Sequence, residues 1–297
     1  MNTKKVNLFL DSGAFSAFTK GVSITIDEYC QFIKQHSDCI SLYANLDVIG
    51  DPVASYRNQM YMERQGLSPI PCFHYGEDEV WLRRYLEKYE YIALGGMVPI
   101  STPDLVDWLD QIFPTFLCDP SGMPRVKVHG FGLTSLRLML RYPWYSVDST
   151  SWVMTGRMGS VLVPRYRDGR YIYGEDSWKI TVSSRSPNKV EAGQHIETLP
   201  PLVRKQILAY FEEKGYRLGK SEFRTESDKY KLQENEKWAG KAGNGKRDVE
   251  LILERGLSND YKLRDELNII YFLDLEKSMQ PWPWPFKLEN CKSGFCL

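Results

Sequence analysis

Six apolar stretches of the sequence end on residues that could do chemistry. Three carboxylates and two imidazoles suit substitution at an anomeric carbon, where one carboxylate attacks or stabilises the developing cation and another moves protons. The third carboxylate can accept the N–H groups of a guanine-like edge. A glycine pair lets a flat ligand approach the backbone closely. The residues are Asp11, Asp47, His74, Gly95 with Gly96, His129 and Asp148.

Each of these residues, taken alone, has a structural alternative. An aspartate after a strand, such as Asp11, can cap the next turn. Histidines at strand ends, such as His74 and His129, often act only as structural hydrogen-bond donors. Asp51, and not Asp47, is placed to cap the following helical segment, which favours a functional role for Asp47. Their shared position at the ends of successive apolar stretches favours a common site.

The segments between these residues predict alternating strands and helices. Eight apolar stretches, rich in β-branched and aromatic residues, alternate with helical patterns such as those of residues 24–36, 51–66 and 101–113. We expect an α/β fold with a parallel sheet, and a (β/α)8 TIM-like barrel more than an open doubly wound sheet. The C-terminal strand ends of a barrel converge on one mouth, where active sites are built. The eight stretches are VNLFLD, CISLYANLD, PIPCFHYG, YIALGG, PRVKVHGFG, WYSVDS, SVLVP and WKITVSS.

We expect two parts, a barrel in residues 1–190 and a helical C-terminal part in residues 191–297 packed on it. Residues 196–219 and 260–277 carry helical patterns of apolar residues. The charged, glycine-containing stretch 221–248 is expected to be a mobile surface insert. Prolines in the tail bar regular structure, and Trp282, Trp284 and Phe286 are expected to dock it as a strap.

Composition limits the classes of partner. The 38 basic and 38 acidic residues give no net charge, so a polyanion must be held by a local patch. The six cysteines lack paired metal-ligand spacing, so we expect reduced thiols in a cytoplasmic protein, with no metal and no cofactor. No stretch reaches the roughly 20 apolar residues of a membrane helix.

A basic and aromatic stretch follows Asp148. Residues 157–189 hold seven basic and three acidic residues, and VPRYRDGRYIYG alternates tyrosines with arginines. This mix is expected where phosphates are paired and unstacked bases meet aromatic rings. A solvated β-hairpin with cross-strand Tyr/Arg pairs explains it equally well. The candidate nucleic-acid contacts are Arg157, Arg165, Arg167, Arg170 and Arg185.

Several motifs together resemble a known superfamily. DSGAF, the strand-end Asp47, ALGGM, HGFG and VDSTS occur in the order found in the tRNA-guanine transglycosylase superfamily, over roughly residues 6–160. The short chain resembles the phage DNA-guanine transglycosylase branch. This resemblance implies a (β/α)8 barrel that exchanges guanine in DNA for a free 7-deazaguanine base, such as the 7-cyano form. The same exchange on tRNA is the near alternative. Members that act on tRNA carry a structural zinc site of three cysteines and a histidine, and this chain has no cysteine between Cys118 and Cys291.

The resemblance also implies a role for each site residue. Asp148 matches the nucleophile that forms a covalent sugar intermediate, and Asp11 matches the general acid/base. Asp47 matches the residue that accepts hydrogen bonds from the N–H groups of the base, and Phe15 the aromatic ring stacked on it. The other matched positions are the backbone edge Gly95, Gly96 and Met97, and the departures His74 and His129, where tRNA enzymes place a glutamine and an apolar residue.

Two other function classes fit the same residues. A retaining glycoside or nucleoside hydrolase would use Asp11 as the acid and Asp148 as the nucleophile, and water would complete the reaction. A catalytically silent nucleic-acid-binding barrel would bind through the basic stretch alone. Release of guanine without replacement identifies the hydrolase, and binding without turnover identifies the silent protein.

Overall fold

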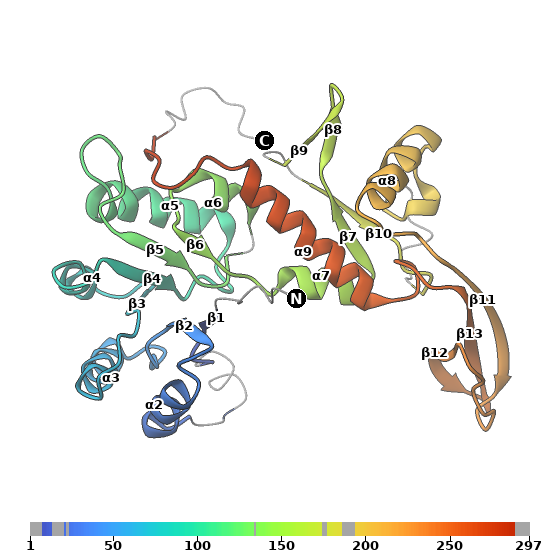
Figure 1. Ribbon diagram of the computed structural model, residues 1–297, viewed down its shortest axis with the longest axis horizontal. Helices are drawn as coiled ribbons and strands as arrows, with labels where there is room; N and C mark the ends of the chain where they lie inside the picture. Colours follow the sequence, from blue (N-terminus) through green and yellow to red (C-terminus); the bar gives the residue numbers. More distant parts are fainter. Residues whose placement is uncertain are drawn as a thin grey trace. The chain divides into compact units, whose positions relative to one another are not determined.

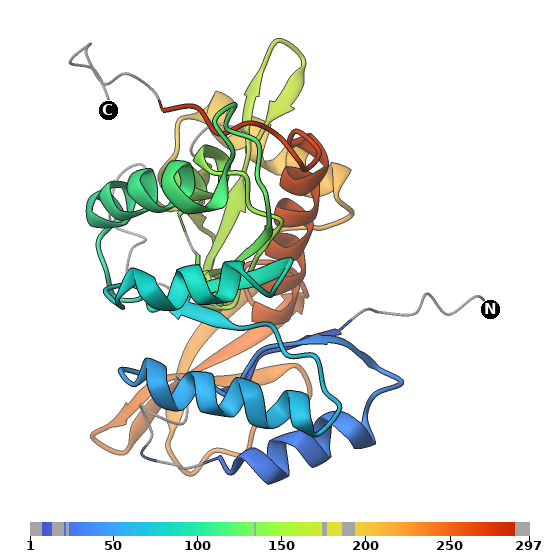
Figure 2. The ribbon, with the colours of Figure 1, turned by 90° about the vertical axis from the view of Figure 1, so that its left-hand side faces the viewer.

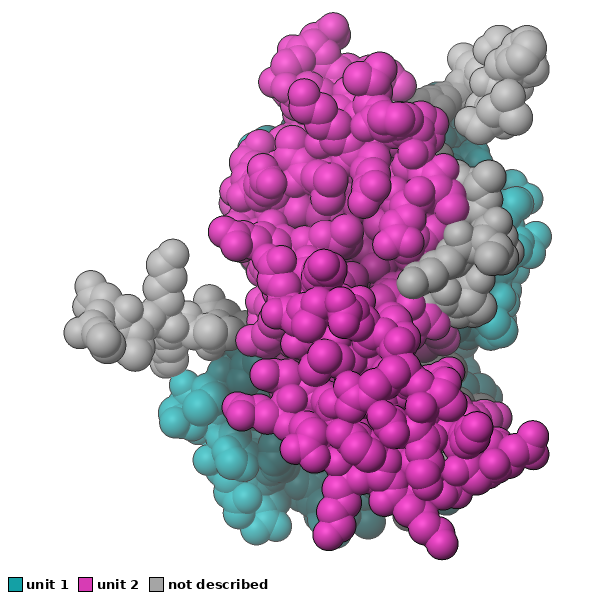
Figure 3. Space-filling model, turned by 90° about the vertical axis from the view of Figure 1, so that its right-hand side faces the viewer, with its two compact units in different colours: residues 1–149, 280–297 teal, residues 150–279 magenta. Residues whose placement is uncertain are grey.

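The computed structural model describes residues 8–13, 21, 24–133, 135–173, 177–185 and 194–288. The chain divides into two compact units, coloured teal and magenta in Figure 3. Unit 1 comprises residues 1–149 and 280–297, and unit 2 comprises residues 150–279. The division after residue 149 differs from the predicted boundary after residue 190, and the tail belongs with the N-terminal unit.

Six parallel strands follow one another in chain order in unit 1 (Figure 1). The strands β3 to β6 are consecutive neighbours, β1 pairs with β2, and a parallel bridge between Ala44 and Ile70 links the end of β2 to the segment before β3. Parallel pairing is therefore confirmed for the first six apolar stretches. The strands are β1 (Leu8–Leu10), β2 (Ile40–Tyr43), β3 (Cys72–His74), β4 (Tyr91–Gly95), β5 (Lys127–Gly130) and β6 (Ser146–Val147).

A helix follows each of the first five strands. Thr25 and Glu28 form a capping box at the first helix, and the Asp51 side chain accepts the Ala54 N–H at the second, where Pro52 occupies the first turn. Figure 2 shows the first four of these helices, blue to green, on the near face. They are α2 (Ile26–Gln35), α3 (Pro52–Arg64), α4 (Glu79–Leu86), α5 (Thr102–Ile112), which continues into the π-helical turn η1 (Phe113–Leu117), and α6 (Leu136–Arg141).

The sheet of unit 1 curls, so that side chains from distant strands meet on its inner face. The rings of Phe9 on β1 and His129 on β5 have centroids 4.5 Å apart, although β2, β3 and β4 separate these strands. Phe9 also packs against the buried residues Cys72 and Ala93. Below the strand ends the inner face thus holds apolar side chains together with the buried His129 ring. Closure into a complete (β/α)8 barrel stays a prediction.

The tail of unit 1 is docked by its aromatic residues, as predicted for Trp282 and Phe286. Trp282 Nε1 donates a hydrogen bond of 3.1 Å to the Pro143 carbonyl. The Phe286 ring stacks on Tyr142 with centroids 5.3 Å apart. These contacts fix the tail without regular secondary structure.

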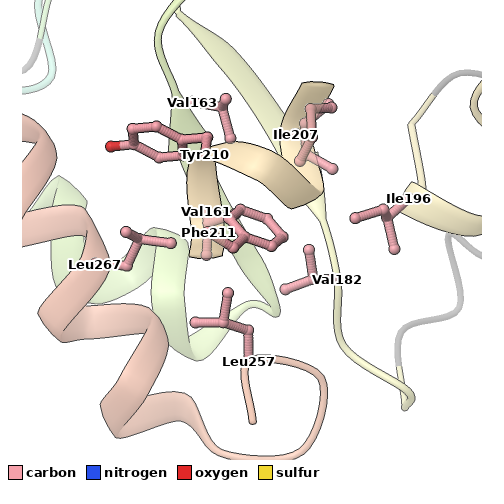
Figure 4. Packing of buried hydrophobic residues seen from close by; sticks show 10 residues of the cluster. Val161, Val163, Val182, Ile196, Ile207, Tyr210, Phe211, Leu257 and Leu267 are labelled. Atoms are coloured by element: carbon pink, nitrogen blue, oxygen red, sulfur yellow. The ribbon is translucent and has the colours of Figure 1, made fainter. Parts of the chain in front are cut away.

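Unit 2 combines helices with small antiparallel sheets. Its core lies where β7, β10 and α8 meet, and Val161 and Phe211 are buried there (Figure 4). Ile180 of β10 belongs to the same buried cluster. The last two of the eight apolar stretches form β7 and β10, but these strands pair antiparallel, which corrects the expectation that they extend a parallel sheet. The elements are α7 (Ser151–Arg157), β7 (Ser160–Val163), β8 (Arg165–Arg167), β9 (Arg170–Ile172), β10 (Trp178–Thr181), η3 (Ile196–Thr198), α8 (Pro201–Glu213), β11 (Lys220–Ser227), β12 (Glu236–Gly243), β13 (Lys246–Glu254) and α9 (Tyr261–Ser278).

The charged stretch 221–248, expected to be a mobile insert in a helical part, instead forms most of an antiparallel sheet in the order β11, β13, β12. Its charges pair across strands, as in the 2.5 Å contact of Arg224 with Glu236. Asn244 and Gly245 form the turn between β12 and β13 with φ of 51° and 69°. An Asn-Gly pair with positive φ at both residues is the preferred two-residue hairpin turn. The many charged residues of this stretch favoured the interpretation as a mobile insert, although the Asn-Gly pair indicates a hairpin.

No helix in the described part of the chain is long and apolar enough to cross a membrane.

Candidate active site at the strand ends of unit 1

The register of the parallel sheet places the predicted site residues of unit 1 in two layers. His74 lies opposite Gly95 at the ends of β3 and β4, and Asp148 follows β6 directly. Side chains two residues apart on a strand project from the same face. A deeper layer therefore lies under these residues on the same face. Four residues that are register partners on neighbouring strands form this deeper layer: Cys72 on β3, Ala93 on β4, His129 on β5 and Ser146 on β6.

Asp47 and His74 form the first carboxylate–imidazole pair. Nε2 of His74 lies 3.7 Å from Oδ2 of Asp47, and Nδ1 lies 3.1 Å from Oε1 of Glu77. Asn45 Nδ2 donates to Oδ1 of Asp47 over 3.0 Å. Burial raises the pKa of Asp47 to about 7, although His74 and Asn45 oppose the rise. Burial alone would lower the pKa of His74, but Cys72, Glu77 and Asp47 raise it well above its usual value.

Asp148 and His129 form the second pair. Nε2 of His129 lies 3.9 Å from Oδ1 of Asp148, and the same oxygen accepts the Gly132 N–H over 2.7 Å. The Asp148 side chain is 49% exposed, whereas that of His129 is 2% exposed. Nδ1 of His129 is 2.7 Å from Ser146 Oγ, which in turn is 2.6 Å from the Tyr91 hydroxyl. In the second pair the carboxylate is therefore accessible to solvent, whereas the imidazole is buried.

The pKa values of the second pair move in opposite directions. Burial lowers the pKa of His129 to about 3, so its ring is neutral. Partial burial raises the pKa of Asp148, the Gly132 N–H opposes the rise, and the Asp11 carboxylate adds to it. No group in the described ranges hydrogen-bonds Nε2 of His129, although this atom is buried. A buried polar atom without a partner is unfavourable, so a ligand atom would be stabilised there.

Asp11 lies within electrostatic range of both other carboxylates. Its charge raises the pKa of Asp47 and of Asp148. It also accepts the Gly13 N–H over 3.3 Å, so the capping role considered from the sequence is present as well. Phe15, the predicted stacking residue, lies outside the described residues.

The glycine pair provides a bare backbone edge beside His74. A Cβ on Gly95 would lie 2.7 Å from Sγ of Cys72 and 3.0 Å from Cδ2 of His74, so any larger residue would clash. Gly96 has a φ of +67°, which L side chains rarely adopt, and it is exposed. Met97, the third residue of the predicted edge, is buried at 3% exposure. The accessible part of this edge is therefore the backbone at Gly96.

The predicted phosphate-binding arginines all belong to unit 2, and three of them lie on the hairpin β8–β9. Arg165, Arg167 and Arg170 flank the turn of Asp168 and Gly169, whose φ values are 50° and 78°. Arg167 and Arg170 are exposed, while the Arg165 guanidinium lies 4.5 Å from the centre of the Trp178 ring. The hairpin itself is confirmed, but its cross-strand partners are Tyr166 with Tyr171 and Arg167 with Arg170, and not the expected Tyr/Arg pairs. The hairpin presents basic side chains.

The other two arginines have different surroundings. Arg157 is exposed at the end of α7. Nη2 of Arg185 lies 2.5 Å from Oε2 of Glu250, whose side chain is fully buried. Arg185 therefore neutralises a buried carboxylate, and this structural role makes it the weakest of the five candidates for phosphate contact.

Several residues of the site were missed from the sequence, and a simple spacing could have found most of them. Asn45 precedes Asp47 by two residues, Cys72 precedes His74 by two, and Ser146 precedes Asp148 by two. Cys72 and His74 lie on β3 and project from the same face of that strand, whereas Asn45 and Asp47 lie beyond the end of β2. Glu77 follows His74 by three residues and turns back onto the ring. Tyr91 has no such local signal, because it reaches Ser146 from another strand.

One group of side chains in the described residues has the composition and spacing of metal ligands. Asp47, Cys72 and His74 each offer a donor atom, and these atoms lie within 4.8 Å of one another. The group lies directly under the bare edge at Gly95.

Comparison of the chain with protein-family models, curated proteins and solved structures finds no match.

Proposed function

We propose that the protein exchanges guanine in DNA for a free 7-deazaguanine base, with Asp148 as the nucleophile. The observation that carries this proposal is the state of Asp148. Its carboxylate is half-exposed, is held by one backbone N–H, and stands beside a neutral imidazole, and no lysine or arginine of the described residues forms an ion pair with it. A carboxylate positioned but not ion-paired is available for covalent attack.

The exchange would proceed in two substitutions at the same carbon. Oδ1 of Asp148 accepts the Gly132 N–H, so attack is assigned to Oδ2. In the first step the Asp148–C1′ bond forms as the C1′–N9 bond of the nucleotide breaks, and the departing guanine takes the electron pair and a proton from Asp11. In the second step Asp11 accepts a proton from the incoming base, whose nitrogen attacks C1′ and releases Asp148. Atoms and charge balance over the cycle without another reactant.

The Asp47 carboxylate would recognise the hydrogen-bonding edge of the base. A carboxylate accepts the N–H groups of a guanine-type edge, and the bare backbone at Gly96 allows the flat ring to approach. The orphaned Nε2 of His129 offers a further hydrogen-bonding atom close to Asp148. Stacking on Phe15 remains part of the proposal.

DNA would be held by the exposed arginines of unit 2. Arg157, Arg167 and Arg170 offer guanidinium groups, and Tyr166, directly before Arg167, is an exposed aromatic ring. Arginine and aromatic side chains together bind phosphates and unstacked bases. The target nucleotide must be flipped or already single-stranded, because the anomeric carbon is inaccessible within a stacked duplex.

Incorporation of labelled guanine tests the proposal. The purified chain is incubated with radiolabelled guanine and, separately, duplex DNA, single-stranded DNA or bulk tRNA, and acid-precipitable label is counted. Label in DNA supports the proposal, and label in tRNA alone assigns the same chemistry to RNA. Release of guanine without incorporation identifies a hydrolase. The Asp148→Asn chain serves as the matched control in every arm.

A further inference from the structure

Three side chains of different chemistry converge beneath the glycine edge. The donor atoms of Asp47, Cys72 and His74 lie within 4.8 Å of one another, and His74 Nε2 is already 3.7 Å from Asp47 Oδ2. Zinc bound tetrahedrally at its usual ligand distances places its donors roughly 3.3–3.8 Å apart. The donor atoms therefore need to approach one another by at most about 1.5 Å to hold one ion.

The three side chains are largely buried, and the backbone beside them leaves space for a ligand. The relative exposure of Cys72 is 1%, and the side chains of Asp47 and His74 are 8% and 14% exposed. A Cβ at Gly95 would lie 2.7 Å from the Cys72 sulfur and 3.3 Å from His74 Nε2, so glycine at this position keeps the space beside both donors open.

Two neighbouring residues orient the ligands. Glu77 lies 3.1 Å from Nδ1 of His74 through one oxygen and accepts the His74 backbone N–H over 3.0 Å through the other. Asn45 donates to Oδ1 of Asp47, which turns Oδ2 toward the histidine. Metal-binding histidines usually donate their second N–H to a carboxylate in this way, which fixes the ring with the other nitrogen facing the metal.

We propose that Asp47, Cys72 and His74 bind one zinc ion, with Glu77 orienting His74 and a fourth coordination position open to water or a ligand. A thiolate together with an imidazole and a carboxylate favours zinc over magnesium or calcium. Binding displaces the Cys72 thiol proton and the proton on His74 Nε2. The site shares Asp47 with the proposed base edge but does not depend on base exchange.

Metal titration of the full chain tests this site directly. The protein is stripped with a chelator, and zinc is added in competition with a chromophoric chelator to measure affinity and stoichiometry. Cobalt substitution gives a second readout, because a thiolate ligand produces a charge-transfer band in the near ultraviolet. We expect one metal per chain and this band in the native protein.

Variants separate the site from adventitious binding. Cys72→Ser should remove the cobalt band and weaken zinc binding by about 100-fold or more, whereas Cys39→Ser, which changes an exposed cysteine, should leave both unchanged. Glu77→Gln should weaken zinc binding about 10- to 100-fold and keep the band. This second variant tests the site even if Cys72→Ser fails to fold.

Three results would overturn the inference: no stoichiometric zinc in the native chain, no thiolate band, or unchanged affinity in Glu77→Gln. Because binding is measured without turnover, a chain that exchanges bases but binds no zinc contradicts only this inference. A chain that binds zinc but exchanges nothing contradicts only the proposed function.

Discussion

Two carboxylate–imidazole pairs lie in the same sheet, at similar distances, and have opposite electrostatic character. His74 faces Asp47 at 3.7 Å and Glu77 at 3.1 Å, and its pKa is raised. His129 faces Asp148 at 3.9 Å but lies against phenyl rings, and burial lowers its pKa to about 3. Residue types are the same in both pairs, although His129 lies one layer deeper in the sheet than His74. The neighbours decide whether the imidazole is a cation.

This difference in electrostatic character suits the two pairs to different roles in the proposed site. The Asp47 carboxylate is buried and held by Asn45 and His74, which suits binding and recognition. The Asp148 carboxylate is half-exposed beside a neutral ring, which suits attack on a substrate. Four predictions test this division, and they are taken in order of decreasing effect.

The largest effect is expected from Asp148→Asn. An amide cannot serve as the nucleophile, so the exchange rate should fall by about 10⁴-fold or more, while the affinity for free base stays unchanged. Rates come from label incorporation and affinities from calorimetry. Substantial exchange by this variant would remove Asp148 from the role of nucleophile.

Asp47→Asn should act on binding instead. The amide keeps the shape of the side chain but loses the charged acceptor, so KM for the base should rise about 10- to 100-fold with a smaller change in kcat. Steady-state exchange at varied base concentration measures both constants. If kcat falls as strongly as in Asp148→Asn, the two pairs do not divide recognition and chemistry.

The pH dependence of exchange should show the raised pKa of Asp148. Only the ionised carboxylate attacks, and a raised pKa keeps the protonated form present to higher pH. The single-turnover rate at saturating base and DNA should therefore decline with falling pH before reaching about 4, the usual range of an aspartate. His129 adds no step there, because its ring stays neutral down to about pH 3. A rate that is constant down to about pH 4 would contradict this assignment.

The smallest effect concerns stability. The folded-state pKa of His129 is about 3, below the unfolded value of about 6.5. The unfolded chain binds more protons between these values, so the contribution of His129 is fully present above about pH 6.5 and is lost as the pH falls toward 3. His129→Gln should flatten the decline of melting temperature from pH 6.5 to pH 4, whereas the exposed His36→Gln should decline like the native chain. Parallel curves for all three proteins would show that His129 is not buried as a neutral ring.

Much of the architecture of unit 1 could be predicted from local patterns. Apolar stretches that end on Asp11, His74 or Asp148 mark strand ends, because a buried strand needs apolar residues and its end meets solvent. Helix N-caps such as Asp51 could be predicted equally well. The antiparallel pairing of β7 with β10 was not, because the apolar pattern of a strand does not specify the direction of its partner.

Within the site, the positions of the functional groups were predictable but their charges were not. His74 and His129 both come near the ends of apolar stretches, but Glu77 lies three residues after His74 and turns back onto its ring, whereas the fold brings Phe9 to His129 from a distant strand. Cys72 was interpreted as an ordinary thiol, since its fellow ligands Asp47 and His74 come from two different strand ends. A spacing search within one segment does not detect ligands gathered in this way.

The central claim is that Asp148 forms a covalent bond to the sugar, and trapping the adduct tests it most directly. The native chain is mixed with guanine-containing single-stranded DNA without free base, denatured rapidly, and separated by denaturing electrophoresis. We predict a slower band that contains both protein and DNA, that disappears when free guanine is added before denaturation, and that is absent for Asp148→Asn. The same band from Asp148→Asn, or exchange by the native chain with no adduct, would contradict the account.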